Sequence, residues 1–214
     1  MAFSDNVWWT RKARIQTEKR LLANALHSQL LLLWFSFCGV AVSVYYMKFD
    51  QAASGGELAG ITWVVYSVLV LCMSGFIAGL SLKERAGLMK ESYEAISSLY
   101  QKSKLNDADI SNLSDEFDKV LGLFENHSDN DYYQALCLEY VTCIGEVDKK
   151  TKLKKGLDRR PTWYHWLSII WWTVRRYLLL TVLYALPISI FYIVQLHTNY
   201  ICIGSRCSTT LSWC

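Results

Sequence analysis

Several sequence patterns that mark common enzyme classes are absent from this chain. Its 214 residues contain no glycine-rich phosphate loop, no His-Glu metal pattern and no nucleophile elbow, which excludes the enzyme classes that depend on them. Residues 125–128 are the only cluster of polar types used in catalysis, and turn and capping roles explain its Asn126 and Ser128. We therefore expect no catalytic residue, no metal site and no cofactor.

Charge is missing from three long stretches of the chain. Leu30 to Met47 and Leu58 to Leu82 have no charged residue, and a third uncharged run extends from Tyr177 past Leu196. About 20 apolar residues cross the hydrocarbon core of a bilayer, and a buried core helix of a soluble protein is rarely this long without charge. These runs predict an all-α membrane protein with a hairpin of two spans and a third span.

Proline is scarce, with two residues in the chain. Pro187 lies inside the third run, where a membrane helix tolerates it if neighbours satisfy the freed carbonyl. Pro161 opens a short segment with four tryptophans, residues 161–176, and tryptophan sits well at the level of the lipid headgroups. We therefore expect an interfacial helix there, with Arg175 and Arg176 marking the point where the chain turns into the third span.

Basic residues lie on one side of the predicted spans. They are frequent before the first span and between residues 83 and 176, whereas the first link has only Lys48 and the end of the chain only Arg206. Positive charge flanking a span stays in the cytoplasm. This distribution predicts a cytoplasmic N-terminus, a cytoplasmic middle and a C-terminus on the outer side. No secretory signal is expected, because the first twenty residues are polar and basic.

The predicted organisation has five parts. They are a basic N-terminal helix (1–29), a two-span transmembrane hairpin (30–82), a cytoplasmic helical domain (83–160), an interfacial Trp-rich helix (161–176), and a third span with a cysteine-containing outer tail (177–214). In an oxidising compartment Cys202 and Cys207 could close a small loop, while free thiols, Cys214 included, are the alternative.

A heptad pattern begins in the second span and continues beyond it. Steps of four and three separate its members, which are Gly75, Gly79, Leu82, Ala86, Met89, Tyr93, Ile96 and Tyr100. This spacing is typical of a coiled-coil seam and predicts one unbroken helix from about Gly60 to Lys104. Gly75 and Gly79 form a GxxxG motif, which lets two helix backbones approach closely. We therefore expect helix packing along the seam and a homo-oligomer.

Small polar residues form a second stripe in the spans. It consists of Gly60, Ser67, Ser74 and Ser81, with Ser36 and Ser43 at the same spacing in the first span. Serine in hydrocarbon must find a hydrogen-bond partner or water. One interpretation is helix packing, with each serine bonded to a carbonyl one turn back. The other is a polar face that lines a pore when several copies assemble.

The cytoplasmic segment keeps the helical period. One apolar face comprises Ile110, Leu113, Phe117, Val120 and Phe124, and another comprises Tyr133, Leu136, Tyr140, Cys143 and Val147. Asp107 or Asp109 can cap the first helix, and Ser128 or Asp129 the second. The N-terminal segment has Trp8, Ile15 and Leu22 at seven-residue spacing. These patterns predict a helical bundle beneath the membrane.

A basic run follows this bundle. It contains Lys149, Lys150, Lys152, Lys154, Lys155, Arg159 and Arg160. Such a run could contact nucleic acid, but its place next to a membrane segment is also explained by cytoplasmic orientation and anionic lipid. The acidic segment from Asp107 to Asp131 argues against a general nucleic-acid surface.

The order of these features resembles the SLATT proteins, bacterial two-helix membrane effectors associated with antiviral conflict systems. The resemblance covers about Trp8 to Tyr140. It rests on the basic helix, the hairpin, the segment Leu82 to Ala86, Tyr93, Leu99-Tyr100, and Leu121 to Tyr133. Its most specific element is Glu125, Asn126, His127 and Ser128. The third span and the cysteine-bearing tail depart from the plain two-span pattern.

The resemblance implies a multi-pass protein of the bacterial inner membrane with a periplasmic C-terminus. Such effectors are thought to form pores or disrupt the membrane once a sensor releases them. Some accompany retrons, where a reverse transcriptase and its RNA–DNA product form the sensor, and the tail suggests that kind. Two other functions stay open, a non-conducting membrane anchor that recruits a soluble partner and a constitutive small channel.

Overall fold

The computed structural model describes residues 3–49, 56–105, 109–148, 153–154 and 156–210, with the side chains of 48–49, 56–59 and 197–210 left aside. Within these ranges the chain forms six α-helices and one isolated bridge between Val147 and Lys154. The helices are α1 (Phe3–Phe49), α2 (Gly56–Gly79), α3 (Leu82–Ser103), α4 (Ile110–Leu123), α5 (Asp129–Thr142) and α6 (Trp163–Thr210). The prediction of an all-α protein is confirmed.

Three stretches of helix are long and apolar enough to cross a membrane. They are Phe3–Met47, Gly60–Ser103 and Trp163–Leu196, and each includes all or most of one uncharged run of the sequence. The fold class predicted from the sequence, an all-α membrane protein with a hairpin and a third helix able to span, is therefore confirmed.

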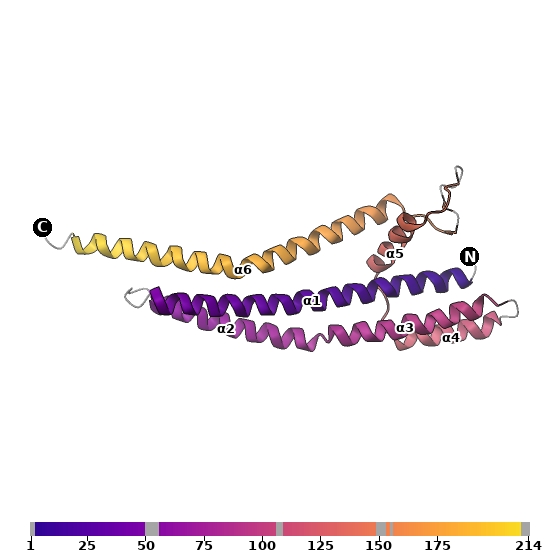
Figure 1. Cartoon of the computed structure of the whole chain (residues 1–214), viewed down its shortest axis with the longest axis horizontal. Helices are drawn as coiled ribbons and strands as arrows, with labels where there is room; N and C mark the ends of the chain where they lie inside the picture. The colour runs from indigo at the N-terminus through magenta and orange to yellow at the C-terminus, as the bar shows by residue number, and fades with distance from the viewer. Residues whose placement is uncertain (1–2, 50–55, 106–108, 149–152, 155, 211–214) are drawn as a thin grey trace. The chain divides into compact units, whose positions relative to one another are not determined.

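The chain divides into two compact units. Unit 1 comprises residues 1–25 and 81–176, and unit 2 comprises residues 26–80 and 177–214. Helices α1 and α6 contribute residues to both units. Figure 1 shows the six helices by label, and each unit is considered by itself below.

Unit 2 has a core made by the apolar parts of α1, α2 and α6. Leu31, Phe35 and Tyr66 are buried at its centre, and residues 180–190 of α6 pack against them. The Tyr66 hydroxyl donates a hydrogen bond to the Phe35 carbonyl at 2.9 Å, and Trp34 Nε1 donates to the Tyr184 carbonyl at 3.0 Å. These hydrogen bonds satisfy polar groups that would find no hydrogen-bond partner in lipid.

Gly39 is the point of close approach between α1 and α2. A Cβ placed on Gly39 would lie 3.4 Å from Cε1 of Tyr66, whereas one placed on Gly60 would meet nothing within 4 Å. The sequence pattern drew attention to the glycines of the second span, but the glycine that admits a neighbouring aromatic ring is in the first.

Replacing Gly39 with leucine is therefore expected to destabilise the hairpin by about 1–3 kcal/mol, because the added atoms overlap the Tyr66 ring. Thermal unfolding of the full chain in detergent, followed by circular dichroism, measures the change. Gly60→Leu is the matched control and should leave the midpoint near that of the unmodified chain. Equal midpoints for the two variants would contradict the close approach at Gly39.

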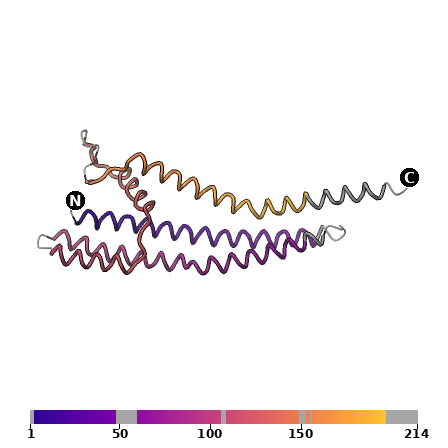
Figure 2. Tube along the Cα trace, turned by 180° about the vertical axis from the view of Figure 1, so that it is seen from behind, coloured from indigo at the N-terminus to yellow at the C-terminus, as the bar shows by residue number. Residues whose placement is uncertain are grey.

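Unit 1 has two apolar clusters along α3. Val7 of α1 meets Ile96, Leu99, Leu113 and Phe117 in the first cluster. In the second, Leu21 of α1 packs against Ala86 and Met89. Figure 1 shows α3 and α4 side by side and running in opposite directions, and the view from behind in Figure 2 agrees.

The helices predicted in the middle of the chain are confirmed as α4 and α5. One of the two predicted N-cap residues is confirmed at the start of each helix. Asp109 accepts hydrogen bonds from the backbone N–H groups of Ser111 and Asn112 at the start of α4. Ser128 caps α5. On α5 the predicted face extends too far, because Cys143 is the C-cap and Val147 lies beyond the helix. On α1 the buried face includes Val7, Ala13 and Leu21 instead of the predicted seven-residue stripe.

Two predictions about helix continuity are wrong. The expected unbroken helix from Gly60 to Lys104 is interrupted between α2 and α3, where Ser81 adopts a left-handed conformation with φ of 44°. Conversely, the turn expected at Arg175 and Arg176 is absent, because α6 is one helix from Trp163 to Thr210 with Pro187 inside it. At Ser81 one residue in the left-handed region ends the helix without a proline or glycine. At Arg175 and Arg176 no helix-breaking residue is present, so the helix continues.

Candidate functional site

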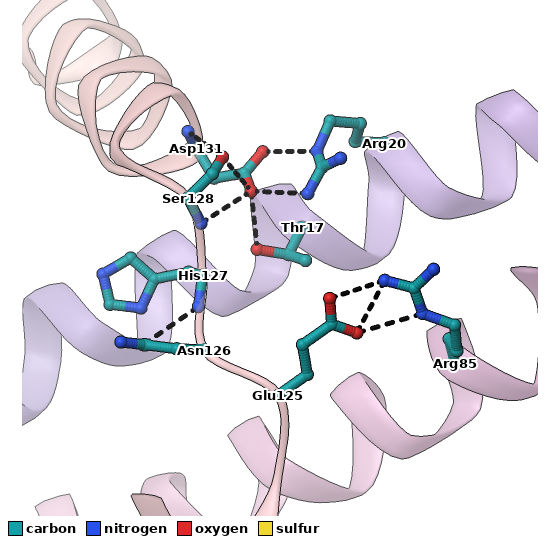
Figure 3. Close-up of polar contacts among 8 residues, drawn as sticks. All are labelled: Thr17, Arg20, Arg85, Glu125, Asn126, His127, Ser128 and Asp131. Atoms are coloured by element: carbon teal, nitrogen blue, oxygen red, sulfur yellow. Dashed lines mark hydrogen bonds and ion pairs between the residues drawn. The ribbon is translucent and has the colours of Figure 1, made fainter.

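Asp131, in the first turn of α5, is the centre of a buried polar cluster in unit 1. Its carboxylate is 1% exposed and accepts hydrogen bonds from Arg20 Nε at 2.8 Å and Arg20 Nη2 at 2.9 Å. Thr17 Oγ1 donates to it at 3.0 Å, and Ser128 Oγ at 2.7 Å (Figure 3). Every oxygen of this buried carboxylate therefore has charged or hydroxyl donors, as burial of a charge requires.

The local sequence explains how Asp131 reaches this place. Ser128 accepts a hydrogen bond from the Asp131 backbone N–H, while the Asp131 carboxylate accepts one from the Ser128 N–H at 3.2 Å. This reciprocal capping box fixes the first turn of α5 and directs the carboxylate toward α1. The Ser-x-x-Asp spacing was the signal in the sequence that could have identified Asp131 as a site residue.

Glu125 attaches the same loop to α3. Its carboxylate accepts hydrogen bonds from Arg85, with Arg85 Nη2 2.5 Å from Oε1 and Nε 3.0 Å from Oε2 (Figure 3). Both side chains are partly exposed, at 39% and 54%. We call the contacts of Glu125 with Arg85 and of Asp131 with Arg20 and Thr17 the loop anchor. The loop anchor ties the α4–α5 loop to α1 and α3, two helices that lead toward the membrane-spanning segments.

His127 lies between the two halves of the loop anchor. Its Nδ1 atom is buried and has no hydrogen-bond partner among the described residues. Its backbone N–H donates to Asn126 Oδ1 at 3.0 Å. Burial lowers the pKa of His127, and the positive charge of Arg14 lowers it further against the opposing pull of Asp131 and Asp129. The neutral imidazole therefore fits this position better than the charged one.

Arg14 is a second buried polar group in unit 1. Its guanidinium donates to the Ser92 hydroxyl through Nη1, while Nε and Nη2 have no hydrogen-bond partner in the described part of the chain. Arg14 and Ser92 are both fully buried. A buried cation with so few acceptors makes the packing of α1 against α3 costly to maintain and sensitive to change.

Acidification is expected to destabilise unit 1. Burial opposes the charge on Asp131, but hydrogen bonds from Arg20, Ser128 and Thr17 and the charge of Arg20 outweigh it and hold its pKa below the ordinary 3.8. The pKa of His127 also lies below its ordinary 6.5. Because both folded-state values are depressed, their contributions are fully present above those ordinary values and are lost as the pH falls through each folded pKa.

Of these two losses of stability, the one at higher pH, which belongs to His127, is the easier to test. Unfolding midpoints of the full chain should begin to decline as the pH falls below the ordinary histidine pKa of 6.5, and His127→Asn should remove that part of the decline. A decline that is unchanged in His127→Asn would contradict the assignment to His127. The decline below about pH 4 should remain in the variant, because it belongs to Asp131.

The basic run is only partly within the described residues. Lys149, Lys150, Lys152 and Lys155 lie outside them. Lys154 donates to the Cys143 carbonyl at 2.8 Å, and Arg159 donates to the Tyr132 hydroxyl and to Asn6 Oδ1, each at 2.8 Å. Arg160 borders a groove of about 440 Å³ whose other lining residues are Tyr140, Pro161, Thr162, Trp163 and Trp166. Two of the three described basic residues thus make contacts within the chain.

The predicted packing residues fall into two groups. Leu82, Ala86 and Met89 lie against α1 in unit 1, and Tyr93 is half-buried. Gly75 and Gly79 are exposed, and a Cβ on either would meet no described atom within 4 Å. The two glycines therefore leave a face of α2 open for close approach by another helix.

The predicted pore-lining serines are all exposed in a single copy of the chain. Three of them donate to the carbonyl one turn back: Ser36 to Leu32, Ser43 to Gly39 and Ser67 to Trp63, at 2.8–2.9 Å. Ser81 stands at the break between α2 and α3. These bonds satisfy the hydroxyl hydrogens and leave the oxygens able to accept from water.

The predicted disulfide between Cys202 and Cys207 falls on side chains outside the described part, as does Cys214. Among the described residues, no group of three or more His, Cys, Asp or Glu side chains could hold a metal ion. What the described site can do is mechanical: it couples the α4–α5 loop to α1 and α3.

Comparison with known proteins gives one match. A sequence model of SMODS and SLOG-associating 2TM effector domain family 5 matches residues 2–193. The match includes the loop anchor, both spans of the hairpin and most of the apolar part of α6. No curated protein and no solved structure matches the chain.

Proposed function

Because the chain belongs to SMODS and SLOG-associating 2TM effector domain family 5, a group of membrane effectors associated with defence systems, we propose that it is an antiviral effector that permeabilises or depolarises the bacterial inner membrane. Copies of the chain assemble in the membrane through α2, with Gly75 and Gly79 at the contact. The protein acts without catalysis, since opening a path for ions requires no chemical step.

One observation carries this proposal, the uncovered face of α2. Within unit 2, α2 packs through Trp63, Tyr66 and Val70. Gly75 and Gly79 are exposed on the opposite side of the helix, and Ser67 and Ser74 are exposed at the edge of the packed side. A helix that packs on one side and presents small residues on another is suited to close association with further copies, with the serines facing a water path.

In the quiet state, the loop anchor holds the α4–α5 loop on α1 and α3. A sensor partner keeps this arrangement until infection, and its release lets the second spans associate. A retron reverse transcriptase with its RNA–DNA product is the sensor that the resemblance implies. The positive charge of the sequence 149–160 favours the anionic lipid of the cytoplasmic leaflet, with the N-terminus in the cytoplasm and the C-terminus in the periplasm.

The test is expression of the chain alone in bacterial cells, with membrane potential recorded by a dye alongside growth. Depolarisation before growth stops is expected. Replacing Ser67, Ser74 and Ser81 together with leucine should abolish it, and toxicity that persists in that variant would contradict the pore-lining role. If the chain is in the membrane and no depolarisation occurs, the measurement is repeated with the neighbouring genes and a phage challenge, and a membrane that stays polarised then contradicts the proposal.

The second candidate function is a non-conducting anchor that recruits a soluble partner. The hydrogen bonds of Ser36, Ser43 and Ser67 within their own helices favour it, because such serines need no water path. An anchor predicts harmless expression and copurification of a soluble partner with the full chain, whereas a constitutive channel predicts steady conductance without a trigger.

A further inference from the structure

The first part of α6, residues 163–176, belongs to unit 1 and packs there through one side. The His165 ring stacks on Tyr133 with 4.5 Å between the ring centroids, and Ser168 Oγ donates to Asn130 Oδ1 at 3.3 Å. At 3.6 residues per turn, both contacts lie on the same broad side of the helix.

The opposite side of this segment is apolar and largely exposed, with Tyr164 at its edge also in contact with the Tyr133 ring. Its members are Trp163 (80% exposed), Tyr164 (64%), Leu167 (54%), Ile170 (57%), Trp171 (69%) and Val174 (53%). We call these six residues the α6 stripe. Steps of four and three separate Trp163, Leu167, Ile170 and Val174, which is the spacing of a coiled-coil seam, and no charged residue interrupts the stripe.

Lipid does not account for this exposure. Residues 180–190 of α6 pack in unit 2 against the apolar runs of α1 and α2, whereas residues 163–176 of the same candidate span, Trp163–Leu196, belong to unit 1. Because α6 is continuous through Arg176, residues 163–176 add about 21 Å of helix before the part of α6 that belongs to unit 2. Residues 163–176 belong to unit 1, together with the charged helices α3, α4 and α5, so the α6 stripe is attached to the polar unit of the chain.

The size of the α6 stripe suits a protein partner. An aromatic side chain buries about 150–250 Å² and the aliphatic ones less, so the exposed parts of the six side chains offer roughly 700 Å². A stable interface takes about 800 Å² from each partner. A contiguous exposed apolar patch of several hundred Å² is characteristic of an interaction site, so the stripe lacks its cover in a single chain.

We infer that the α6 stripe binds the α6 stripe of a second copy of this chain. An uncharged apolar stripe with heptad spacing is complementary to itself, because no like charges meet. The side chains of one copy can then pack between those of the other, as in a coiled coil. This inference rests on the proposed function for one point, that several copies assemble in one membrane. Copies inserted in the same direction carry parallel α6 helices, so each residue of the stripe faces its own counterpart.

Cysteine cross-linking in membranes tests the parallel contact. In the full chain, Leu167→Cys should give a disulfide-linked dimer under mild oxidation, in excess of that formed by the unmodified chain with its own cysteines. Ile144→Cys is the matched control, because Ile144 is 99% exposed and lies outside the stripe. A Leu167→Cys signal no greater than that of Ile144→Cys overturns the inference.

A charge test gives independent support. In a chain whose α2 contact is removed by Gly75→Leu and Gly79→Leu, the further changes Leu167→Glu and Ile170→Glu place carboxylates inside the α6 contact and should abolish the remaining dimer in native mass spectrometry of detergent-solubilised chain. The control in the same background is Val141→Glu with Ile144→Glu, two exposed apolar residues outside the stripe, which should keep the dimer. Retention of the dimer in both variants overturns the inference.

The outcomes separate this inference from the proposed function. If the stripe variant loses the dimer while the unmodified chain never depolarises cells, the contact stands and the effector proposal fails. If the stripe variant keeps its dimer while expression of the unmodified chain depolarises cells, the effector proposal stands and the α6 contact is wrong.

Discussion

Replacing Asp131 with alanine is expected to lower the free energy of unfolding of the chain by about 3 kcal/mol. The variant loses the carboxylate that pairs with Arg20 and accepts from Thr17 and Ser128, and removing one member of a buried ion pair leaves the other without compensation. The estimate is at the low end for buried pairs, because Arg20 is 26% exposed and can turn its guanidinium toward water.

The matched control is Asp129→Ala, in the same first turn of α5. Asp129 is exposed, so its loss should cost only the favourable interaction with the helix N-terminus, about 0.3–1 kcal/mol. Thermal or chemical unfolding in detergent compares the two variants. Equal destabilisation would show that the carboxylate of Asp131 is not paired in solution, which contradicts the geometry of the loop anchor.

Replacing Gly75 and Gly79 together with leucine is expected to abolish membrane depolarisation in expressing cells. Two leucine side chains on the open face of α2 would hold a neighbouring helix away and should weaken association of the spans by at least about tenfold. The fold of a single copy should be unaffected, because a Cβ at either position meets nothing within 4 Å. Dye-reported membrane potential and cross-linking in membranes measure the two effects.

Ala41→Leu serves as the control for added bulk in a span. Ala41 is an exposed small residue of α1, outside the GxxxG face. This variant should depolarise cells as the unmodified chain does. Depolarisation that survives in the double glycine variant at equal protein level would mean that the copies associate through some other surface of the spans.

Much of the fold could be predicted from the sequence because the relevant signals are local. Uncharged runs identify helices able to span, and the cap residues Asp109 and Ser128 mark the starts of α4 and α5. The lower part of the heptad pattern was also informative, since Ala86, Met89 and Ile96 are buried in unit 1. Periodicity identifies such a face directly.

The loop anchor was harder to predict because its partners are distant in sequence. Arg20 and Asp131 are 111 residues apart, and Arg85 and Glu125 are 40 apart. Glu125 belonged to the most specific part of the family resemblance, but nothing local identified Arg85 as its partner. Gly39 was overlooked for the same reason, since its importance depends on Tyr66 of another helix.

The two errors of helix continuity have a common cause. Sequence signals for helix ends are glycine, proline and capping side chains, and Ser81 makes no side-chain cap hydrogen bond. A serine in the left-handed region costs roughly 1–2 kcal/mol, which tertiary packing has to offset. At Arg175 and Arg176, by contrast, charge predicts a turn, but arginine is a good helix former and α6 continues through both residues.

The chain passes between its two units three times, and these crossings differ in stiffness. At residues 25–26 and 176–177 the crossing is made by the continuous helices α1 and α6, which transmit both a pull and a twist. At residues 80–81 the crossing is made by Ser81, whose backbone is in the left-handed region. Rotation about the backbone bonds of Ser81 would let α2 turn relative to α3. Movement of the unit 1 helices would thus be passed directly to the apolar parts of α1 and α6, while α2, with its glycines and serines, can rotate independently of α3.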